Sequence, residues 1–326
     1  MALYNAEQFI GEALDSIMCQ TYANWELIIV DDCSTDKSLE IIKKYSDDRI
    51  ILLQNKINSG PAISRNKALN AAKGEYVAVL DADDIMFPNR LEIQVNYLIK
   101  HTQIDILGTS ALMIDECGNK LTVSKYYMSP EEIKTTILFR CPLIHSSVMM
   151  RKAFLVNNDL SYNENFPCNQ DYELWSRVVF LGNIRIIPDV LVKYRISPNQ
   201  ISQKKRQKQL DLALSLRKSY LKKQGLTLSI NEIEIFNEIE NRYIPEKEKV
   251  EDIIKRLVVS GCFNRTTVYL FLFSYYRLKY SHLESIMLIL KFQKSCSVSP
   301  FEFVRFNISY FANISYSLLG NLTLKK

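Results

Sequence analysis

The strongest constraint in this chain is an apolar run that stops abruptly in acids. Residues 76–80 read Tyr-Val-Ala-Val-Leu, and Asp81, Asp83 and Asp84 follow directly. Such a run is typical of a buried parallel strand, and in an open α/β sheet ligands bind where the strands end. Crowded carboxylates repel one another unless a cation lies among them, and Mg²⁺ or Mn²⁺ prefers oxygen ligands. The segment therefore predicts a metal–nucleotide site, with a solvated polar strand exit as the alternative.

A second apolar run has the same ending. Residues 25–30 close on Asp31 and Asp32. The spacing of apolar residues predicts a helix over 36–45, with a hydroxyl of Ser34–Thr35 as its N-cap. Two strands that both end in acids are expected to place the chemistry of the protein along one edge of a sheet.

A Gly-Pro turn lies between these two runs. Gly60-Pro61 leads into a predicted helix that carries Arg65 near its start. A cation at this position would meet a phosphate or an acid of the same edge. The alternative is an arginine that faces solvent from a helix.

The order of these motifs resembles that of glycosyltransferase family 2, the inverting nucleotide-sugar enzymes with a GT-A fold. A lone Asp-x-Asp is weak evidence, but several ordered segments at matching spacing are specific. The resemblance covers roughly the first 200 residues, in segments 4–5, 20–22, 30–36, 58–66, 73–84 and 170–175.

The resemblance implies a role for each matching residue. Asp32 would accept a hydrogen bond from the nucleotide base, with Tyr4 packing nearby. Arg65 matches a basic position near the nucleotide, and Asp81 would face the ribose. Asp83, with Asp81, would hold the Mn²⁺ or Mg²⁺ that bridges the diphosphate. The adjacent acid at position 84 has only a supporting part.

The resemblance also implies that Asp171 is the catalytic base that removes a proton from the acceptor hydroxyl. Sugar transfer needs a carboxylate to activate the hydroxyl and a cation to stabilise the departing diphosphate. Asp171 begins a predicted helix over 172–181, so the alternative is an acid that complements the helix dipole. The family usually has Glu-Asp here, whereas this chain has Gln170 before Asp171.

The amino end departs from the family pattern. Family members begin with a hydrophobic strand, and this chain opens directly at Met1-Ala2-Leu3-Tyr4-Asn5. Because that strand lies centrally in a GT-A sheet, we expect a truncated first strand, unpaired backbone groups on its neighbours and an open slot. The hypothesis is that the true start lies upstream or that the chain is a fragment.

The rest of the pattern predicts two regions. We expect residues 1–199 to form the α/β GT-A catalytic domain, with a nucleotide-binding half at 1–100 and an acceptor half at 101–199. The acceptor half should contain strands and one helix. The expected strands are 104–114, 144–150 and 184–192, and the expected helix is 130–139.

The C-terminal region, 200–326, is expected to be a basic, mainly helical extension. Residues 1–199 hold 20 Lys/Arg against 25 Asp/Glu, a net −5, and residues 200–326 hold 21 against 11, a net +10. Basic residues mixed with Tyr and Phe suit a helix on an anionic membrane surface, or an appendage packed on protein. The apolar run at 268–276 is too short to cross a bilayer. Nucleic-acid binding is not expected, because no reader motif accompanies the charge.

The cysteines indicate the compartment. The seven cysteines have no paired spacing, which predicts reduced thiols, no zinc site and a cytoplasmic protein. The basic C-terminal region adds the expectation of a peripheral location at the inner face of the plasma membrane. His145 is expected to be structural, with the lining of an acceptor pocket as its alternative.

The predicted function is therefore transfer of a sugar from a nucleoside-diphosphate sugar, with UDP preferred, to a hydroxyl with inversion. The acceptor implied by the family is a growing surface glycan, perhaps lipid-linked. Two alternatives stay open. One is a non-catalytic family member that acts as a binding partner in glycan assembly. The other is a haloacid-dehalogenase-type phosphatase with Asp81 as its nucleophile.

Overall fold

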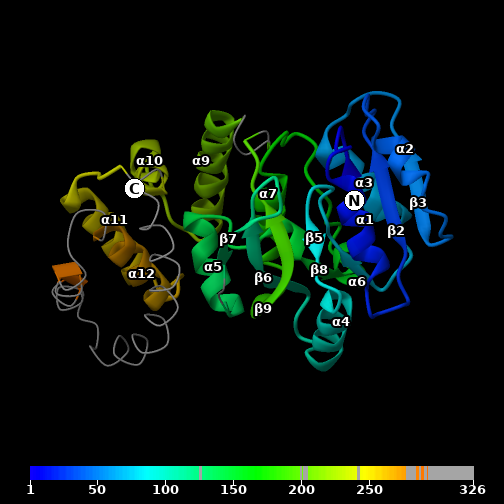
Figure 1. Cartoon of the computed structure of the whole chain (residues 1–326). Coiled ribbons are helices and arrows are strands. Elements are labelled where there is room, and N and C mark those ends of the chain that lie inside the picture. Colours follow the sequence, from blue (N-terminus) through cyan, green and yellow to red (C-terminus); the bar gives the residue numbers. More distant parts are fainter. Residues whose placement is uncertain are drawn as a thin grey trace. The chain divides into compact units, whose positions relative to one another are not determined.

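The computed structural model describes residues 1–124, 127–198, 200, 205–240 and 243–276, and single residues or pairs at 284–285, 288–289 and 292. The chain forms two compact units (Figure 1). The first unit consists of residues 1–129 and 143–205, and the second consists of 130–142 and 206–326.

The first sheet of the first unit is parallel and has the order β1-β2-β3. Its strands are β1 (Ala2–Leu3), β2 (Leu27–Asp31) and β3 (Ile50–Gln54), and all five residues of β2 are buried. Parallel pairing aligns Leu3 with Asp31, so the carboxyl ends of β1 and β2 meet at one edge. The expectation that both acid-ended runs share one sheet edge is wrong, because the run at 25–30 gives β2 of this sheet and the run at 76–80 belongs to the second sheet.

Helices α1 (Ile10–Met18), α2 (Ser38–Ile42) and α3 (Pro61–Ala71) belong to this part of the fold (Figure 1). The helix expected over 36–45 is shorter, and the predicted hydroxyl cap is wrong. The helix begins after Lys37, and the Asp36 carboxylate accepts the backbone N–H of Ser38 at 2.9 Å. Ser34 is engaged elsewhere, because its Oγ accepts the N–H of Asn5.

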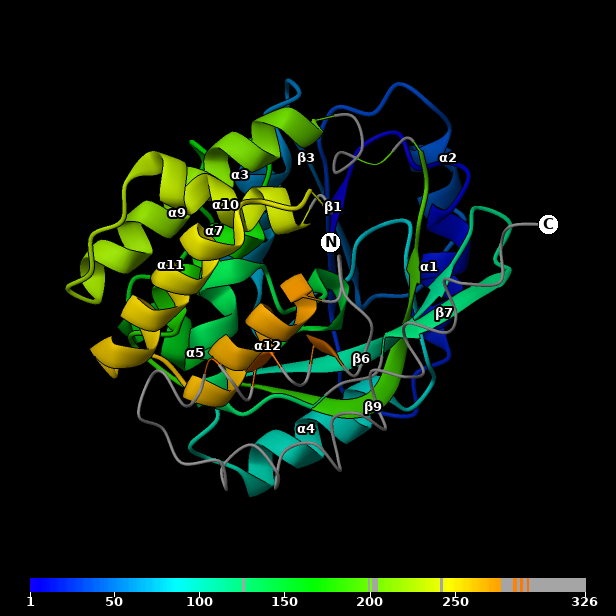
Figure 2. The ribbon, with the colours of Figure 1, turned by 90° about the vertical axis from the view of Figure 1, so that its left-hand side faces the viewer.

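The second sheet has the order β4-β8-β6-β9-β5, with β7 paired to β6. Figure 2 shows β6, β7 and β9 of this sheet side by side. Its strands are β4 (Tyr76–Ala78), β5 (Ile85–Met86), β6 (Ile106–Ile114), β7 (Lys120–Ser124), β8 (Met149–Arg151) and β9 (Ile184–Arg195).

The prediction of a buried parallel strand over 76–80 is wrong in both respects. β4 pairs antiparallel with β8, and Tyr76 and Val77 are only half-buried. Tyr76 and Val77 are only half-buried because a cavity of 640 Å³ lies between β2 and β4, lined by Ile28 and Val77 among others. The amino group of Met1 lies at this cavity and donates to the carbonyl of Ile28 at 2.7 Å. The slot expected beside a short first strand is thus present.

Three further helices complete the first unit: α4 (Arg90–Lys100), α6 (Lys152–Asn157) and α7 (Gln170–Val178). The strands predicted at 104–114 and 184–192 are confirmed as β6 and β9. The strand predicted over 144–150 is wrong in its first half, where residues 145–147 form the 3-10 turn η1 (His145–Ser147). The turn is held by Ser147, whose N–H and hydroxyl both donate to the carbonyl of Ile144.

The described part of the second unit is helical, as predicted for the C-terminal region, and the unit also includes residues 130–142, which were expected in the acceptor half. It contains α5 (Pro130–Phe139), α9 (Arg206–Lys223), α10 (Ile230–Glu240), α11 (Lys247–Ser260) and α12 (Arg265–Tyr276). Aromatic side chains join three of these helices, because Phe139 stacks on Phe271 and meets Phe236 edge to face. Lys204 and most of the predicted extension beyond residue 276 lie outside the described residues. Within the described part, every helix is too short or too polar to cross a bilayer.

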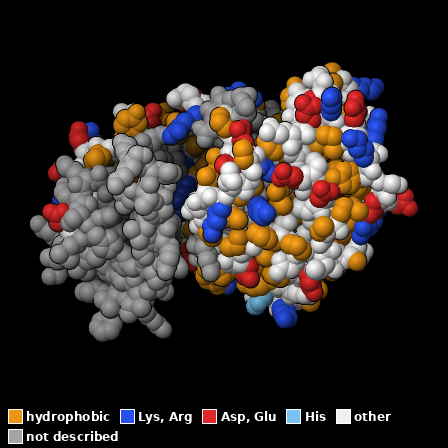
Figure 3. All heavy atoms as spheres, viewed as in Figure 1, with side chains coloured by type: hydrophobic (Ala, Val, Ile, Leu, Met, Phe, Trp, Pro, Cys, Tyr) orange, Lys and Arg blue, Asp and Glu red, His pale blue; other side chains and the backbone are white. Residues whose placement is uncertain are grey.

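The face seen in Figure 3 carries both signs of charge. Lys and Arg side chains lie interspersed with acidic and hydrophobic ones over the described atoms. A mixed surface of this kind is ordinary for a soluble fold and gives this face no strong field of one sign.

Candidate active site

Asp32 anchors the loop that leads into α3. Its Oδ1 accepts from Asn55 Nδ2 at 2.7 Å and from the N–H of Ser59 at 2.9 Å, and its Oδ2 accepts from the N–H of Gly60 at 2.7 Å. Gly60 has φ of 90°, a conformation that glycine adopts without strain. Asp32 is buried, and a carboxylate has about four acceptor positions, so these contacts leave capacity for about one further donor.

Tyr4 follows β1 directly and is half exposed at the same edge. Its neighbour Asn5 joins this segment to the loop after β2, because Asn5 Oδ1 accepts the N–H of Thr35 at 2.8 Å. Tyr4 and Asp32 therefore extend from the ends of two adjacent parallel strands.

Arg65 and Asp81 form an ion pair. Arg65 Nη2 lies 2.7 Å from Asp81 Oδ1, and the two side chains are 16% and 26% exposed. The backbone N–H of Asp81 donates to Ser146 Oγ at 3.1 Å, which ties the acid to η1. Burial acts to raise the pKa of Asp81, but Arg65 and His145 outweigh it and lower the pKa to about 2. Asp81 is therefore ionised at neutral pH.

Burial and neighbouring negative charges disfavour the ionised forms of the two acids after Asp81, Asp83 and Asp84. Burial, and then repulsion from Asp81, raise the pKa of Asp83 to about 6. Burial and the charges of Asp83 and Asp81 raise the pKa of Asp84 well above its usual range. Asp84 is 1% exposed, and its Oδ1 accepts the backbone N–H of Arg195 at 2.8 Å.

Asp171 lies on α7, within electrostatic reach of the residues around Asp81. Its charge acts on Arg65, His145 and Tyr162, and the charge of Asp81 acts on the same three side chains. The acid from the strand end and the acid from α7 thus act on one set of buried side chains.

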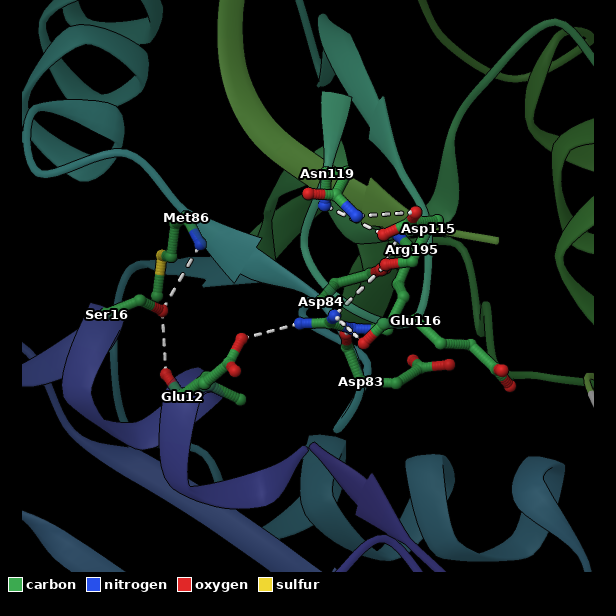
Figure 4. Close-up of polar contacts among 10 residues, drawn as sticks. Glu12, Ser16, Asp83, Asp84, Met86, Asp115, Glu116, Asn119 and Arg195 are labelled. Carbon is green, nitrogen blue, oxygen red and sulfur yellow. Dashed lines mark hydrogen bonds and ion pairs between the residues drawn. The ribbon is translucent and has the colours of Figure 1, made fainter. Parts of the chain in front are cut away.

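The structure adds contacts that the sequence did not predict, around His145, which was expected to be structural, and around Arg195, which no motif singled out. His145 is buried, its Nε2 lies 3.3 Å from the hydroxyl of Tyr162, and its Nδ1 has no hydrogen-bond partner among the described residues. Arg195, at the end of β9, is the centre of the polar cluster in Figure 4 and ties Asp83 to Glu12. No sequence motif marks these contacts, because each joins positions far apart in the chain.

Asp81 and Asp83 could supply some, but not all, of the ligands that a hard divalent cation needs. Asp81 and Asp83 offer oxygen donors only, and burial and the charge of Asp81 raise the pKa of Asp83. No group of three or more His, Cys, Asp or Glu side chains that could hold a metal ion was found among the described residues. A divalent ion bound here would therefore draw further ligands from a substrate, as Mg²⁺ does when it is shared with phosphates.

The comparisons with known proteins agree with this arrangement. The sequence model described as "Glycosyl transferase family 2" matches residues 1–160. An uncharacterized glycosyltransferase of Haemophilus influenzae is 33% identical over 269 residues, which are 78% of this chain and 82% of that protein. The Escherichia coli UDP-Glc:alpha-D-GlcNAc-diphosphoundecaprenol beta-1,3-glucosyltransferase WfgD is 35% identical over 208 residues, 63% of this chain and 79% of that protein.

The fold is also similar to a solved structure. S. aureus TarS 1-349, crystallised with UDP-GlcNAc, superposes with a TM-score of 0.59 at 19% identity, over 92% of this chain and 91% of that chain. At this identity the likeness concerns the fold alone, and it supports the predicted GT-A architecture. The family assignment argues against the haloacid-dehalogenase alternative. The sequence relatives, the fold and the acid-lined sheet edge together identify the chain as a member of glycosyltransferase family 2.

Proposed function

We propose that this glycosyltransferase moves a sugar from a nucleoside-diphosphate sugar, of the UDP class, to a hydroxyl of a lipid-linked glycan, with inversion at the anomeric carbon. The observation that carries the proposal is that the charges of Asp81 and Asp171 act on the same buried side chains, Arg65 and His145. Relatives whose names specify UDP-Glc and a diphosphoundecaprenol acceptor support the donor class and the lipid-linked acceptor.

Each acid has a separate part in the proposed reaction. The acceptor hydroxyl oxygen bonds to the anomeric carbon while its proton passes to a carboxylate oxygen of Asp171. The bond from that carbon to the diphosphate breaks at the same time, and the diphosphate leaves with the electron pair. Because the oxygen enters opposite the leaving group, one such displacement inverts the configuration. General base catalysis of this kind typically contributes about 10²–10⁴-fold to the rate.

The remaining residues bind and orient the donor. Tyr4 and Asp32 contact the base, and Asp81 faces the ribose while its ion pair with Arg65 fixes the orientation of both side chains. Asp83, with Asp81, would hold Mn²⁺ or Mg²⁺, which when bound would neutralise the charge that develops on the diphosphate.

The proposal assigns residues 1–199 to catalysis, with 1–100 for the nucleotide and 101–199 for the acceptor. The basic region 200–326, with its net charge of +10 from 21 Lys/Arg and 11 Asp/Glu, contacts the anionic membrane that carries the lipid-linked acceptor. The enzyme would then work in the cytoplasm at the inner face of the plasma membrane. Vesicle sedimentation with anionic and with neutral lipid would test this contact.

The decisive experiment separates binding from chemistry at Asp171. Asp171→Asn should keep nucleoside-diphosphate binding within about twofold of the parent, while sugar transfer falls by about 10²-fold or more, as expected for loss of a general base. Donor binding would be followed by thermal shift with Mn²⁺, and the product anomer by NMR. The matched control is Glu164→Gln, which changes an exposed acid nearby.

Several results would refute the proposal. Unchanged turnover in Asp171→Asn would remove that residue as the base, and retention of configuration would remove the single displacement. A parent protein that binds donors but never transfers would favour the non-catalytic alternative.

A further inference from the structure

Arg195 joins four separate segments of the first unit (Figure 4). Its Nε donates to the carbonyl of Asp83 at 2.8 Å, and its Nη2 lies 2.6 Å from Glu12 Oε2 on α1. Its Nη1 donates to the carbonyls of Asp115 and Glu116, in the turn between β6 and β7, at 3.2 and 2.9 Å. Its own backbone belongs to β9. One side chain therefore links a strand end, a helix, a hairpin turn and the segment 81–84 with its three aspartates, here called the acid loop.

The backbone of Arg195 also holds the acid loop. Its N–H donates to Asp84 Oδ1 at 2.8 Å, beside the side-chain contact with the Asp83 carbonyl. The two consecutive acids are therefore fixed by one residue, Asp83 through its main chain and Asp84 through its carboxylate. The Asp83 carboxylate is hydrogen-bonded to Gln200, and the charge of Arg195 favours its ionised form.

The geometry of the guanidinium makes these contacts interdependent. The group is planar and its donors form a rigid fork, so Nε cannot move away from Asp83 without disturbing the bonds to Glu12 and Glu116. Its face also lies 4.5 Å from the ring centre of Phe9, which limits rotation further. Lysine, with a single ammonium on a flexible stem, cannot reproduce this set of contacts.

The burial of this cation requires an explanation. The side chain of Arg195 is 1% exposed, whereas its ion-pair partner Glu12 is 57% exposed. A buried charge is costly unless it is well paired and hydrogen-bonded, and replacement of such groups by apolar ones is often tolerated. An arginine at this position suggests a role beyond stability. Its Nε is bonded to the main-chain carbonyl of Asp83, in the acid loop.

We propose that Arg195 is a positioning residue for the reaction, which fixes the main chain at Asp83 and Asp84 so that the Asp83 carboxylate faces the diphosphate of the donor. Arg195 itself contacts neither the donor nor the acceptor. The catalytic consequence rests on the function proposed above for Asp83, whereas the restraint of the acid loop does not.

The experiment compares two arginines that donate to main-chain carbonyls, Arg195, which is buried, and Arg151, which is half-buried. Arg195→Met and Arg195→Lys are the test variants. Arg151→Met is the matched control, because Arg151 donates to the carbonyls of Ile104 and Leu98 and lies over the ring of Tyr76, away from the acid loop. Thermal unfolding measures the general loss of stability in each variant.

Hydrogen exchange measures the restraint of the acid loop without any ligand. The amides of Asp84 and Met86 are bonded to the carbonyl of Asp81 and to Ser16 Oγ. In Arg195→Met, peptides covering residues 81–87 should exchange about tenfold faster or more, since bonds from a charged donor are among the stronger ones. Arg151→Met should leave the exchange of these peptides unchanged, even if its melting temperature falls as much as that of Arg195→Met.

The second readout is the Mn²⁺ concentration that gives half-maximal UDP binding. It should rise about tenfold or more in Arg195→Met, less in Arg195→Lys, and less than about twofold in Arg151→Met. Equal exchange at 81–87 in Arg195→Met and Arg151→Met would overturn the positioning role. If Arg195→Met does not fold, Arg195→Lys decides by the same exchange comparison. If the parent shows no Mn²⁺-dependent UDP binding, the function proposed for Asp83 fails, while hydrogen exchange still decides the role of Arg195.

Discussion

The buried histidine of the active site gives a prediction about stability and pH. His145 is 7% exposed and lies among Arg65 from α3, Asp81 from the strand end and Asp171 from α7. Burial first, and then the charge of Arg65 and of the Met1 amino group, lower its pKa, while the two acids raise it. The result is a pKa of about 4, against 6.5 for an ordinary histidine. The folded protein therefore holds this imidazole neutral at pH 5 to 6.

The sign of the effect follows from proton binding. Between pH 6.5 and 4 the unfolded chain binds a proton at His145 and the folded chain does not, so acid favours unfolding. The contribution of His145 to stability is thus complete above pH 6.5 and is lost as the pH falls toward 4. The difference of 6.5 − 4, about 2.5 pKa units, corresponds to about 3 kcal/mol at roughly 1.36 kcal/mol per unit, which is an upper bound for a partly relaxed site.

Urea denaturation of the parent and of His145→Gln at intervals from pH 7.5 to 4.5 measures this contribution. The variant keeps a hydrogen-bonding side chain opposite Tyr162 but cannot titrate. The parent's free energy of unfolding, minus that of the variant, should fall by up to about 3 kcal/mol over this range. Asp83, whose raised pKa acts in the opposite direction, is present in both proteins and largely cancels. A constant difference, or one that grows as the pH falls, would refute the reasoning, because His145 would then be protonated in the fold.

Three further substitutions test other parts of the structure. Asp83→Asn should stabilise the metal-free protein at pH 8 by about 1–3 kcal/mol, since it removes a buried carboxylate repelled by Asp81, and should abolish stabilisation by Mn²⁺ with UDP. A less stable metal-free variant would contradict this. Gly182→Ala should cost about 1–3 kcal/mol in urea denaturation, because its Cβ would lie 2.5 Å from the ring of Phe154. Gly11→Ala, inside α1 with its nearest neighbour at 3.9 Å, should instead stabilise by about 0.5–1 kcal/mol, and a cost there would count against the packing of α1.

The sequence predicted two strands that end in acids, but not the sheets to which they belong. An apolar run that ends in acids is a local pattern, whereas its pairing partners are set by packing, and β2 and β4 lie in different sheets. Asp32 follows β2, and the Arg65–Asp81 ion pair lies at the end of the second run. Local patterns also predicted α5 and β9, because periodicity and turn residues are read from neighbours in the chain.

The sequence misjudged features that depend on what lies beside a segment. The run at 76–80 has the composition of a buried parallel strand, yet β4 pairs antiparallel with β8 and borders a cavity. The sequence predicted that a hydroxyl of Ser34 or Thr35 caps α2, whereas the Asp36 carboxylate accepts the first N–H of the helix. Ser34 and Thr35 are instead hydrogen-bonded to Asn5, which follows β1. Pairing partners are set by tertiary packing, so composition alone does not fix them.

What the chain alone determined is thus its family, its class of fold and the order of the acids proposed for the active site, since these depend on residue types and their order. Only the tertiary structure decided the environment of those acids. It placed Arg65 against Asp81, His145 in a position where it stays neutral, and Arg195 across the backbone of Asp83. Burial and charge at each site come from residues far apart in sequence, and no local pattern encodes the distance between them.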